Sequence, residues 1–293
     1  MSAEKRYPQA YLALLAGLVA IGFSPVLIKM ASAPGIITSF YRLSIGAVVL
    51  TIPFTVNILK KRKKIPLKGI LFASLAGFCF ASDMSLWSTG IVASNATLPT
   101  LTGNMAPLWV GIGAMVIFKE KQKAGFWLGL LLAFGGVSLL IINNISDSSG
   151  VLKGMIMGLF AGMFYAGYLL FTQPGRQHLD TITFLYISTL STSIFLAIYA
   201  TILNLDFTGY DNRTWILFLI MGIGIQAIAW FLINYSQGYL PASTVSPTLL
   251  GQPVISAFLA YFLVDEQLTG WHIAGGIIVV VGIYLVHFSR KTK

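Results

Sequence analysis

The chain has 293 residues, of which 56% are hydrophobic and only 10% are charged, and its formal net charge is +10. A soluble domain usually carries about 25% charged residues, so this composition excludes a soluble globular protein. It indicates an all-α, polytopic membrane protein surrounded by a lipid bilayer. The basic residues fall mainly in short loops, so the positive charge gives no reason to expect nucleic acid as a partner. The single cysteine, Cys79, excludes a disulfide within the chain.

Ten apolar stretches follow one another along the chain, each close to the roughly 20 residues that a helix needs to cross a bilayer. The polar loops between them are short, and none is long enough to form a soluble domain. The sequence therefore predicts ten transmembrane helices. They are expected at residues 9–31, 35–58, 68–92, 95–117, 124–143, 151–172, 180–204, 213–237, 242–264 and 270–288.

The distribution of Lys and Arg predicts the orientation of these helices. With the N-terminus in the cytoplasm, fifteen of the 19 basic residues lie in cytoplasmic segments, while Lys153 and Arg213 lie outside. The remaining two, Lys29 and Arg42, lie within predicted helices. Because basic residues are enriched in cytoplasmic loops, we expect both termini in the cytoplasm. The expected location is a prokaryotic inner membrane.

An internal repeat relates the two halves of the chain, residues 1–146 and 147–293. The segment that begins at Asn95 matches the segment that begins at Pro241, and four residue pairs carry the match: Pro107 and Pro253, Glu120 and Glu266, Gly129 and Gly275, Gly136 and Gly282. Each half holds five predicted helices, and because five is odd, the second half enters the membrane from the opposite side. Inverted repeats are typical of secondary transporters, whose substrate site lies near the midplane between the halves.

Further segments of the two halves strengthen a resemblance to a known family. They are SFYRLSIGAVVL at Ser39, SNATLPTLTGNMAPLWV at Ser94 and YLPASTVSPTLLGQP at Tyr239. Together with the paired Pro, Glu and Gly positions, they make the chain similar to EamA-type members of the drug/metabolite transporter superfamily. The resemblance implies ten helices, cytoplasmic termini and alternating access around a central cavity. It also implies the transport of amino acids or other small polar metabolites, often outward.

Three ionisable residues are candidates for handling charge. Asp83 is the only acidic residue that we place within a predicted helix, and Arg42 and Lys29 are expected at a similar depth. Such residues usually face the bundle interior or a water-filled cavity. Asp83 either takes up a proton or binds a cationic group of the substrate, or it forms a fixed ion pair with Arg42 or Lys29. Lys29 has the further alternative of extending to the outer surface.

Polar and aromatic residues on apolar helices indicate where a central cavity is expected. In helix 213–237 one stripe contains Gln226, Trp230, Asn234 and Gln237, and it faces either a cavity or a polar helix contact. Tryptophan rings would offer a surface for stacking or for a substrate cation. The residues expected to line the cavity are Ser24, Trp87, Asn104, Tyr165, Trp230, Asn234 and Gln252.

Other residues are expected to shape the helices. Pro107 and Pro253 lack a backbone N–H and are predicted to kink the helices that contain them. Glu120 and Glu266 are interpreted as caps at the positive ends of the helices that follow them. Small residues at a spacing of four allow close packing in lipid, which we expect at Gly154, Gly158 and Gly162.

Several functions are disfavoured by what the sequence lacks. No motif predicts a metal site or a cofactor, and no phosphate-binding loop predicts the use of ATP. Two alternatives to an exporter stay open: a transporter for uptake or exchange of organic anions, with Lys29 and Arg42 as a clamp, and a membrane-embedded enzyme acting on a lipid-linked substrate. The expected partners are a small-molecule substrate, the bilayer and, if Asp83 is the coupling group, protons. The oligomeric state stays open, with a monomer among the alternatives.

Overall fold

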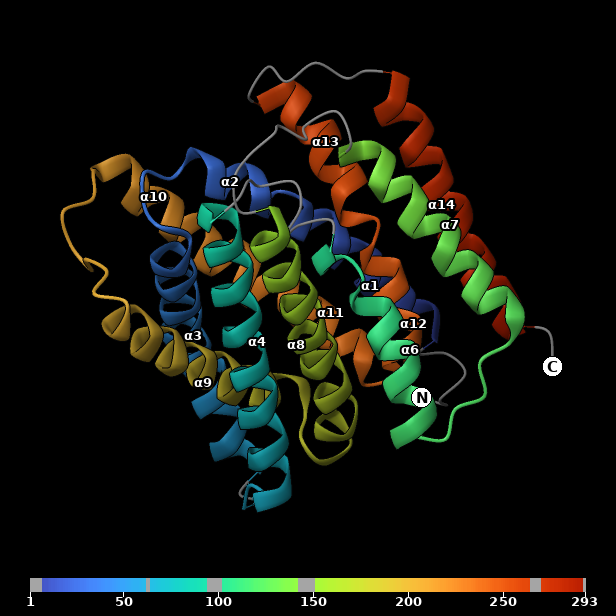
Figure 1. The fold of residues 1–293 in the computed structure, drawn as a ribbon. Helices are drawn as coiled ribbons and strands as arrows, with labels where there is room; N and C mark the ends of the chain where they lie inside the picture. The colour runs from blue at the N-terminus through green and yellow to red at the C-terminus, as the bar shows by residue number, and fades with distance from the viewer. Residues whose placement is uncertain (1–6, 62–63, 94–101, 142–150, 264–269, 292–293) are drawn as a thin grey trace.

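The computed structural model describes residues 7–61, 64–93, 102–141, 151–263 and 270–291, and the regular structure in these ranges is helical throughout (Figure 1). The first half contains α1 (Tyr7–Gly22), α2 (Ser24–Met30), α3 (Gly35–Lys61), α4 (Leu67–Ala93), α6 (Ala106–Ile117) and α7 (Ala124–Ile141). The second half contains α8 (Val151–His178), α9 (Thr181–Ile202), α10 (Asn212–Ile220), the π-helix η3 (Met221–Ala229), α11 (Trp230–Gln237), α12 (Ala242–Leu249), α13 (Gln252–Leu263) and α14 (Gly270–Lys291).

Eight of the helical stretches are long and apolar enough to cross a membrane. They coincide with eight of the ten predicted windows. The two other windows, 95–117 and 124–143, contain shorter apolar helices in the described residues, Ala106–Ile117 and Ala124–Leu139. The fold is therefore all-helical with eight candidate membrane spans.

Three of the predicted windows are interrupted rather than continuous. Phe23 separates α1 from α2, Asn104 and Met105 precede α6, and Leu250 and Gly251 separate α12 from α13. In each case a proline is the second residue of the helix that follows. The three prolines are Pro25, Pro107 and Pro253. A proline is tolerated in the first turn, where its missing N–H has no partner to lose and its fixed φ suits the helix.

The prolines at 107 and 253 thus differ from the prediction of a kink inside a continuous helix. Each follows a two-residue turn in which Met105 and Leu250 keep right-handed helical dihedrals while the backbone bonds are those of a tighter turn. The two breaks also occupy equivalent positions of the internal repeat, since Asn104 and Met105 correspond to Leu250 and Gly251. Whether either break acts as a hinge stays a prediction.

The predicted helix 213–237 contains an unexpected π-helical segment, η3, between α10 and α11. Close packing accompanies it: a Cβ added to Gly222 would lie 2.5 Å from Cγ2 of Ile45 in α3. A side chain at this position would therefore keep the two helices apart. Because π-helices are rare and are frequently found at functional sites, η3 draws attention to the residues it carries.

Helices α7 and α14 lie side by side along one edge of the bundle (Figure 1). A Cβ on Gly129 would lie 2.7 Å from the carbonyl oxygen of Gly282, and one on Gly136 would lie 2.6 Å from that of Gly275. The residue number rises along one helix as it falls along the other, so the pair is antiparallel. Small residues allow this close approach of two backbones.

Two further contacts between the halves are equivalent to each other in the repeat: the packing of α4 on α8 and the packing of α1 on α11. Helix α4 packs on α8, where a Cβ on Gly167 would lie 2.9 Å from Sγ of Cys79. Helix α1 packs on α11, where a Cβ on Gly17 would lie 2.8 Å from Cγ1 of Ile233. The predicted glycine stripe of α8 supports packing as well, because a Cβ on Gly162 would lie 2.7 Å from the carbonyl oxygen of Gly103.

Candidate functional site

The two ionisable residues Arg42 and Asp83 lie buried in the bundle, with exposed fractions of 4% and 7%. Helix α3 carries the first and α4 the second, and the two helices meet beside them, where the hydroxyl of Ser39 donates to Sδ of Met84 at 3.8 Å. Among the described side chains, however, no hydrogen bond or ion pair joins Arg42 to Asp83. The described part of the structure therefore does not contain the fixed ion pair between Asp83 and Arg42 that was one of the alternatives. The side chain of Lys29, the other candidate partner, lies outside the described part of the structure.

Arg42 is held by polar residues from two other helices. Its Nη1 donates to the hydroxyl of Ser24 in α2 at 3.1 Å, and its Nε and Nη2 both donate to Oε1 of Gln226 in η3 at 3.4 Å. The amide of Gln226 in turn donates to the hydroxyl of Thr189 in α9 at 3.0 Å. A guanidinium has five N–H donors, so three are used and two remain for a ligand.

Asp83 presents the opposite situation, because its carboxylate makes no hydrogen bond to any residue in the described ranges. A charged group that is buried without a partner is very unfavourable. It has to be neutralised by a proton or by a cation. An unsatisfied buried group in a native protein usually has a functional explanation.

Aromatic rings form a cluster near the two charges. Trp230 of α11 contacts the rings of Phe80, Tyr165 and Tyr168, with centroid separations of 4.9, 6.4 and 5.2 Å. The hydroxyl of Tyr165 makes no hydrogen bond within the described residues, and the indole N–H of Trp230 is buried and also lacks a partner there. The cluster thus combines ring surface with two unused polar groups.

The polar stripe predicted on helix 213–237 divides between two environments. Gln226 binds Arg42, and Trp230 belongs to the aromatic cluster. Asn234 donates to the hydroxyl of Tyr168 at 3.0 Å, and Gln237 donates to the carbonyl oxygen of Leu169 at 3.3 Å. The C-terminal part of the stripe, Asn234 and Gln237, therefore forms a polar contact between α11 and α8.

Three other predicted cavity residues lie close to the helix breaks. Asn104 is half-buried within the turn before α6, and the half-buried Trp87 lies near it, because its Cδ1 would be 3.9 Å from a Cβ on Gly103. Gln252 begins α13 and donates to the carbonyl oxygen of Ile21 in α1 at 3.4 Å. The described contacts do not join these three residues to Arg42 or Asp83.

Sequence reasoning left four central residues out of the candidate set: Gln226, Thr189, Phe80 and Tyr168. Signals for most of them were present. Phe80 precedes Asp83 by three residues and Tyr168 follows Tyr165 by three, so both share a helix face with a predicted residue. Thr189 belongs to a group of buried hydroxyl residues on α9, with Ser188, Thr192 and Ser193, but no pattern indicated that it would face Gln226.

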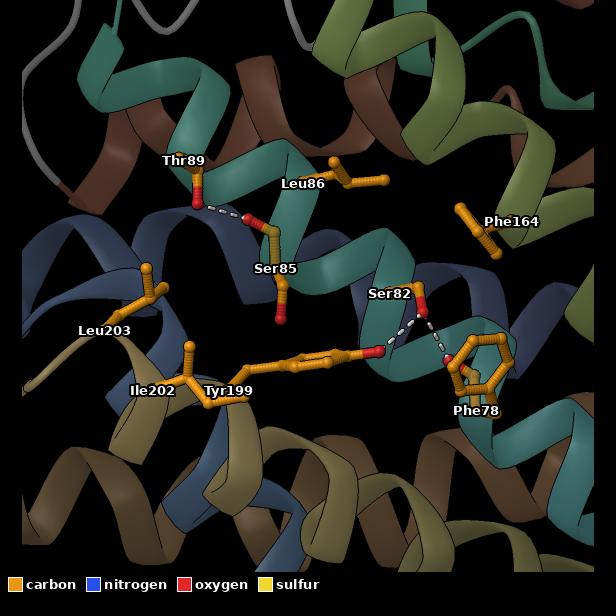
Figure 2. Close-up of a pocket in the computed structure, with 9 residues that line it drawn as sticks. All are labelled: Phe78, Ser82, Ser85, Leu86, Thr89, Phe164, Tyr199, Ile202 and Leu203. Atoms are coloured by element: carbon orange, nitrogen blue, oxygen red, sulfur yellow. Dashed lines mark hydrogen bonds between the residues drawn. The ribbon is translucent and has the colours of Figure 1, made fainter.

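A separate pocket of about 370 Å³ lies between α4, α8 and α9 (Figure 2). Ser82 and Tyr199 share a hydrogen bond of 3.0 Å within it, and the buried hydroxyl of Ser85 makes none. The pocket lies on a different face of α4 from Asp83, and none of the predicted cavity residues lines it. The lining residues are Phe78, Ser82, Ser85, Leu86, Thr89, Phe164, Tyr199, Ile202 and Leu203.

A polar network joins the two halves at the end of α6. Glu120 accepts hydrogen bonds from Ser243 at the start of α12 and from Nε2 of Gln173 in α8, the latter at 3.5 Å. Gln173 also accepts from the backbone N–H of Ala242 at 2.7 Å. These contacts link Glu120 to the second half, beyond the capping role that its position suggested. Glu266 lies outside the described residues.

Within the described ranges, His, Cys, Asp and Glu form no group of three or more that would hold a metal ion. The chemistry of the central site is instead that of two opposite charges, amides, hydroxyls and aromatic rings. Such groups can bind a polar solute.

A membrane-embedded helical bundle with two buried, unjoined charges has the character of a solute transporter. Comparison with protein families agrees with this class. The EamA-like transporter family matches residues 8–142 and again residues 152–288. The chain belongs to this family and is a multi-pass membrane transporter.

Individual relatives are distant but cover most of the chain. It is 26% identical to "Uncharacterized transporter YwfM" of Bacillus subtilis over 75% of this chain and 74% of the relative. It is 25% identical to "Probable amino-acid metabolite efflux pump" of Salmonella typhimurium over 63% of this chain and 64% of the relative. A crystal structure of 13% identity has the same fold, with a TM-score of 0.81 over 98% of this chain and 100% of that one.

Proposed function

We propose that the protein is a secondary active exporter of small polar metabolites such as amino acids, located in a prokaryotic inner membrane. The observation that carries this proposal is the pair of buried, opposite charges that do not bond to each other. An interior of this kind is costly for a protein that only needs to be stable. It is useful to one that binds a charged solute and releases it again.

We further propose that two inverted five-helix halves, residues 1–146 and 147–293, provide alternating access around a central cavity. Two observations support the inversion. The helix breaks before Pro107 and Pro253 occupy equivalent positions, and the equivalent helices α7 and α14 pack antiparallel. Inverted halves give two related states that open to opposite sides. The proposal places both termini in the cytoplasm and, in line with the positive-inside rule, Glu120 on the same side.

Asp83 supplies the proposed coupling to protons. Its carboxylate has no hydrogen-bonding partner among the described residues, so either a proton or a cationic group of the substrate neutralises it. The two cannot occupy it together. Proton uptake from one side would therefore follow substrate release on that side, which is the exchange that a proton-driven exporter requires.

The proposed cavity contains Ser24, Tyr165, Trp230 and Asn234 near the charges, with Trp87, Asn104 and Gln252 at the helix breaks. The first group lies next to Arg42 or within the aromatic cluster. Asn104 and Gln252 lie at the breaks before α6 and α13, and Trp87 of α4 lies next to Gly103, close to the first of them. We assign Lys29 to charge handling from its place in the sequence alone.

One observation favours a second candidate function, the uptake or exchange of an organic anion. Arg42 retains two N–H donors, which suit a carboxylate or phosphate. This alternative uses Arg42 and Lys29 as an anion clamp and gives Asp83 no contact with the substrate.

Transport by the purified protein in liposomes tests the proposed function. The assay uses a panel of amino acids, amines and phosphorylated metabolites, with and without a pH gradient. We expect movement of at least one amino acid, faster with a proton gradient directed against the solute. Empty liposomes are the control and should transport nothing, and the Arg42→Gln variant, which lacks the guanidinium that would bind a carboxylate, should transport no amino acid.

The other outcomes have definite meanings. Movement of phosphorylated or carboxylate solutes alone supports the anion transporter and contradicts the exporter of amino acids. Movement of no solute in the panel contradicts transport of small polar metabolites altogether.

A further inference from the structure

The lack of a direct bond between Arg42 and Asp83 within the described residues needs a physical cause, because a buried guanidinium is strongly attracted to a nearby carboxylate. Arginine has a long, flexible side chain, and α3 and α4 are in contact near both groups, where Ser39, three residues before Arg42, donates to Met84, the neighbour of Asp83. Even so, no ion pair forms between the two charged groups within the described part of the chain. Some other contact must keep the guanidinium in place.

Gln226 accepts two of the three hydrogen bonds that hold the guanidinium, and Ser24 accepts the third. Oε1 of Gln226 accepts from both Nε and Nη2 of Arg42 at 3.4 Å, so it takes one whole edge of the guanidinium. Thr189 accepts from Nε2 of Gln226 at 3.0 Å and thereby fixes the direction of the amide. With Gln226 only 2% exposed and Arg42 4% exposed, water has little room to replace these bonds.

The backbone around Gln226 favours this arrangement. Gln226 belongs to η3, where the wider π-helical turn alters the direction of side chains relative to an α-helix. A Cβ on Gly46 in α3 would lie 2.5 Å from Cγ of Gln226, so this glycine lets the Gln226 side chain lie against α3, the helix that carries Arg42. The π-helical turn of η3 and the glycine at position 46 thus both favour the hydrogen bonds between Gln226 and Arg42.

We propose that Gln226 is a positioning residue that holds the Arg42 guanidinium apart from Asp83, so that one zwitterionic substrate bridges both charges. The carboxylate of the substrate binds the two unused N–H donors of Arg42, and its ammonium group binds Asp83. This inference rests on the proposed function and narrows its substrate class from small polar metabolites to zwitterions.

The aromatic cluster defines the third part of the substrate. Phe80 lies one turn before Asp83 on α4, and Trp230 and Tyr165 complete an apolar surface next to it. A ring face also attracts a cation, which supports an ammonium group near Asp83. The substrate class is therefore a zwitterion that carries an apolar side group.

Binding to the purified protein tests this assignment with two amino acids and their singly charged derivatives. The probes are leucine and phenylalanine, their amides, which keep only the positive charge, and their N-acetyl forms, which keep only the negative charge. We expect at least one amino acid to bind about tenfold or more tightly than both of its derivatives, because each derivative loses a charged contact. Arg42→Gln should favour the amide, and Asp83→Asn should favour the N-acetyl form.

A double-mutant cycle separates positioning from a merely structural role. In Gln226→Leu, Arg42 is free to pair with Asp83, so affinity for the N-acetyl form should fall by about tenfold or more. In the Asp83→Asn background the same change should have little effect, because Arg42 then has no carboxylate to join. Gln237→Leu removes another buried amide of the same helix and is the control for loss of a polar contact.

Three results would overturn the inference. One is equal or weaker binding of both amino acids relative to a singly charged derivative, or no binding of either. Another is an equal effect of Gln226→Leu in both backgrounds. The third is transport in liposomes of singly charged solutes alone. That result would contradict the zwitterionic substrate but not the proposal that the protein is a transporter.

Discussion

Asp83 is the residue whose surroundings depart most from those of an ordinary membrane helix. It is 7% exposed, carries no hydrogen bond within the described residues, and lies one helical turn from an aromatic ring. Arg42 is equally buried but is held by Ser24 and Gln226. The Arg42 guanidinium is therefore held by hydrogen bonds, whereas the Asp83 carboxylate has none within the described residues. This asymmetry agrees with the sequence, because the second half has Ala229 at the position that matches Asp83.

The Asp83→Asn variant tests the coupling role at this scale. Where Asp83 titrates, the proton occupancy of the wild type changes by up to about tenfold per pH unit, and we expect the transport rate to follow it. Asparagine cannot take up a proton, so whatever transport remains in the variant should have a flat pH profile and gain nothing from a pH gradient. Initial rates in liposomes between pH 5 and pH 8 provide the measurement.

The exposed loop residue Asp206 supplies the matched control, because Asp206→Asn makes the same chemical change away from the bundle. Its pH profile should equal that of the wild type. Normal transport and an unchanged profile in Asp83→Asn would show that Asp83 is not the coupling group.

Much of the central site was visible in the sequence, and its bonding was not. Charged residues such as Asp83 and Arg42 are conspicuous in apolar helices because their burial is costly. The partner of each one depends on how the helices pack. Gln226 and Thr189 lie on different helices of the second half, and nothing in their spacing predicts that they would join Arg42. The sequence therefore indicated candidate residues for a site but not the hydrogen bonds among them.

At the scale of helices, two adjacent glycines of α7 experience opposite environments. A Cβ on Gly136 would lie 2.6 Å from the carbonyl oxygen of Gly275 and 2.7 Å from the backbone nitrogen of Val279. A Cβ on Gly135 would meet nothing within 4 Å. The same substitution at neighbouring positions therefore separates close packing from helix propensity.

We expect Gly136→Ala to destabilise the protein by about 1–3 kcal/mol, because the added methyl group meets backbone atoms that cannot move aside. Gly135→Ala should be neutral or should stabilise by up to about 1 kcal/mol, because alanine favours the helix. Thermal unfolding in one detergent measures both variants. A loss of stability in Gly135→Ala, or none in Gly136→Ala, would contradict the close contact of α7 with α14.

The helices were largely predictable because about 20 consecutive apolar residues have few other solutions in a bilayer. The interruptions were less so. Pro107 and Pro253 suggested disturbed helices, but a proline is compatible with a kink, a break or a regular first turn. Packing decides among these, as at Gly22, where a Cβ would lie 2.4 Å from Cγ2 of Ile255 in α13. The π-helix η3 had no sequence signal that we recognised.

At the scale of the whole molecule, the two halves are joined both in the centre and at one end. In the centre, Gln226 of the second half binds Arg42 of the first. At the end of α6, Glu120 of the first half binds Ser243 and Gln173 of the second. An alternating-access cycle would have to break one such set of contacts while it keeps the other.

The proposed inverted arrangement leads to a test of the whole molecule. Helix α7 begins shortly after Glu120 and α14 shortly after Glu266, and the two helices lie antiparallel and side by side (Figure 1). If both cross the bilayer, their starting ends have to lie on opposite sides of it. A cysteine at position 121 should then react with a membrane-impermeant thiol reagent only from the cytoplasm, and one at position 267 only from outside.

The Cys79→Ala background removes the single native thiol, which is buried between α4 and α8. A cysteine at Lys293, near the predicted cytoplasmic C-terminus, gives the reference for the inner side. Labelling of positions 121 and 267 from the same side would contradict the inverted halves, and with them the pair of related states on which alternating access depends. Opposite labelling, with position 121 matching position 293, supports both the inversion and the predicted orientation.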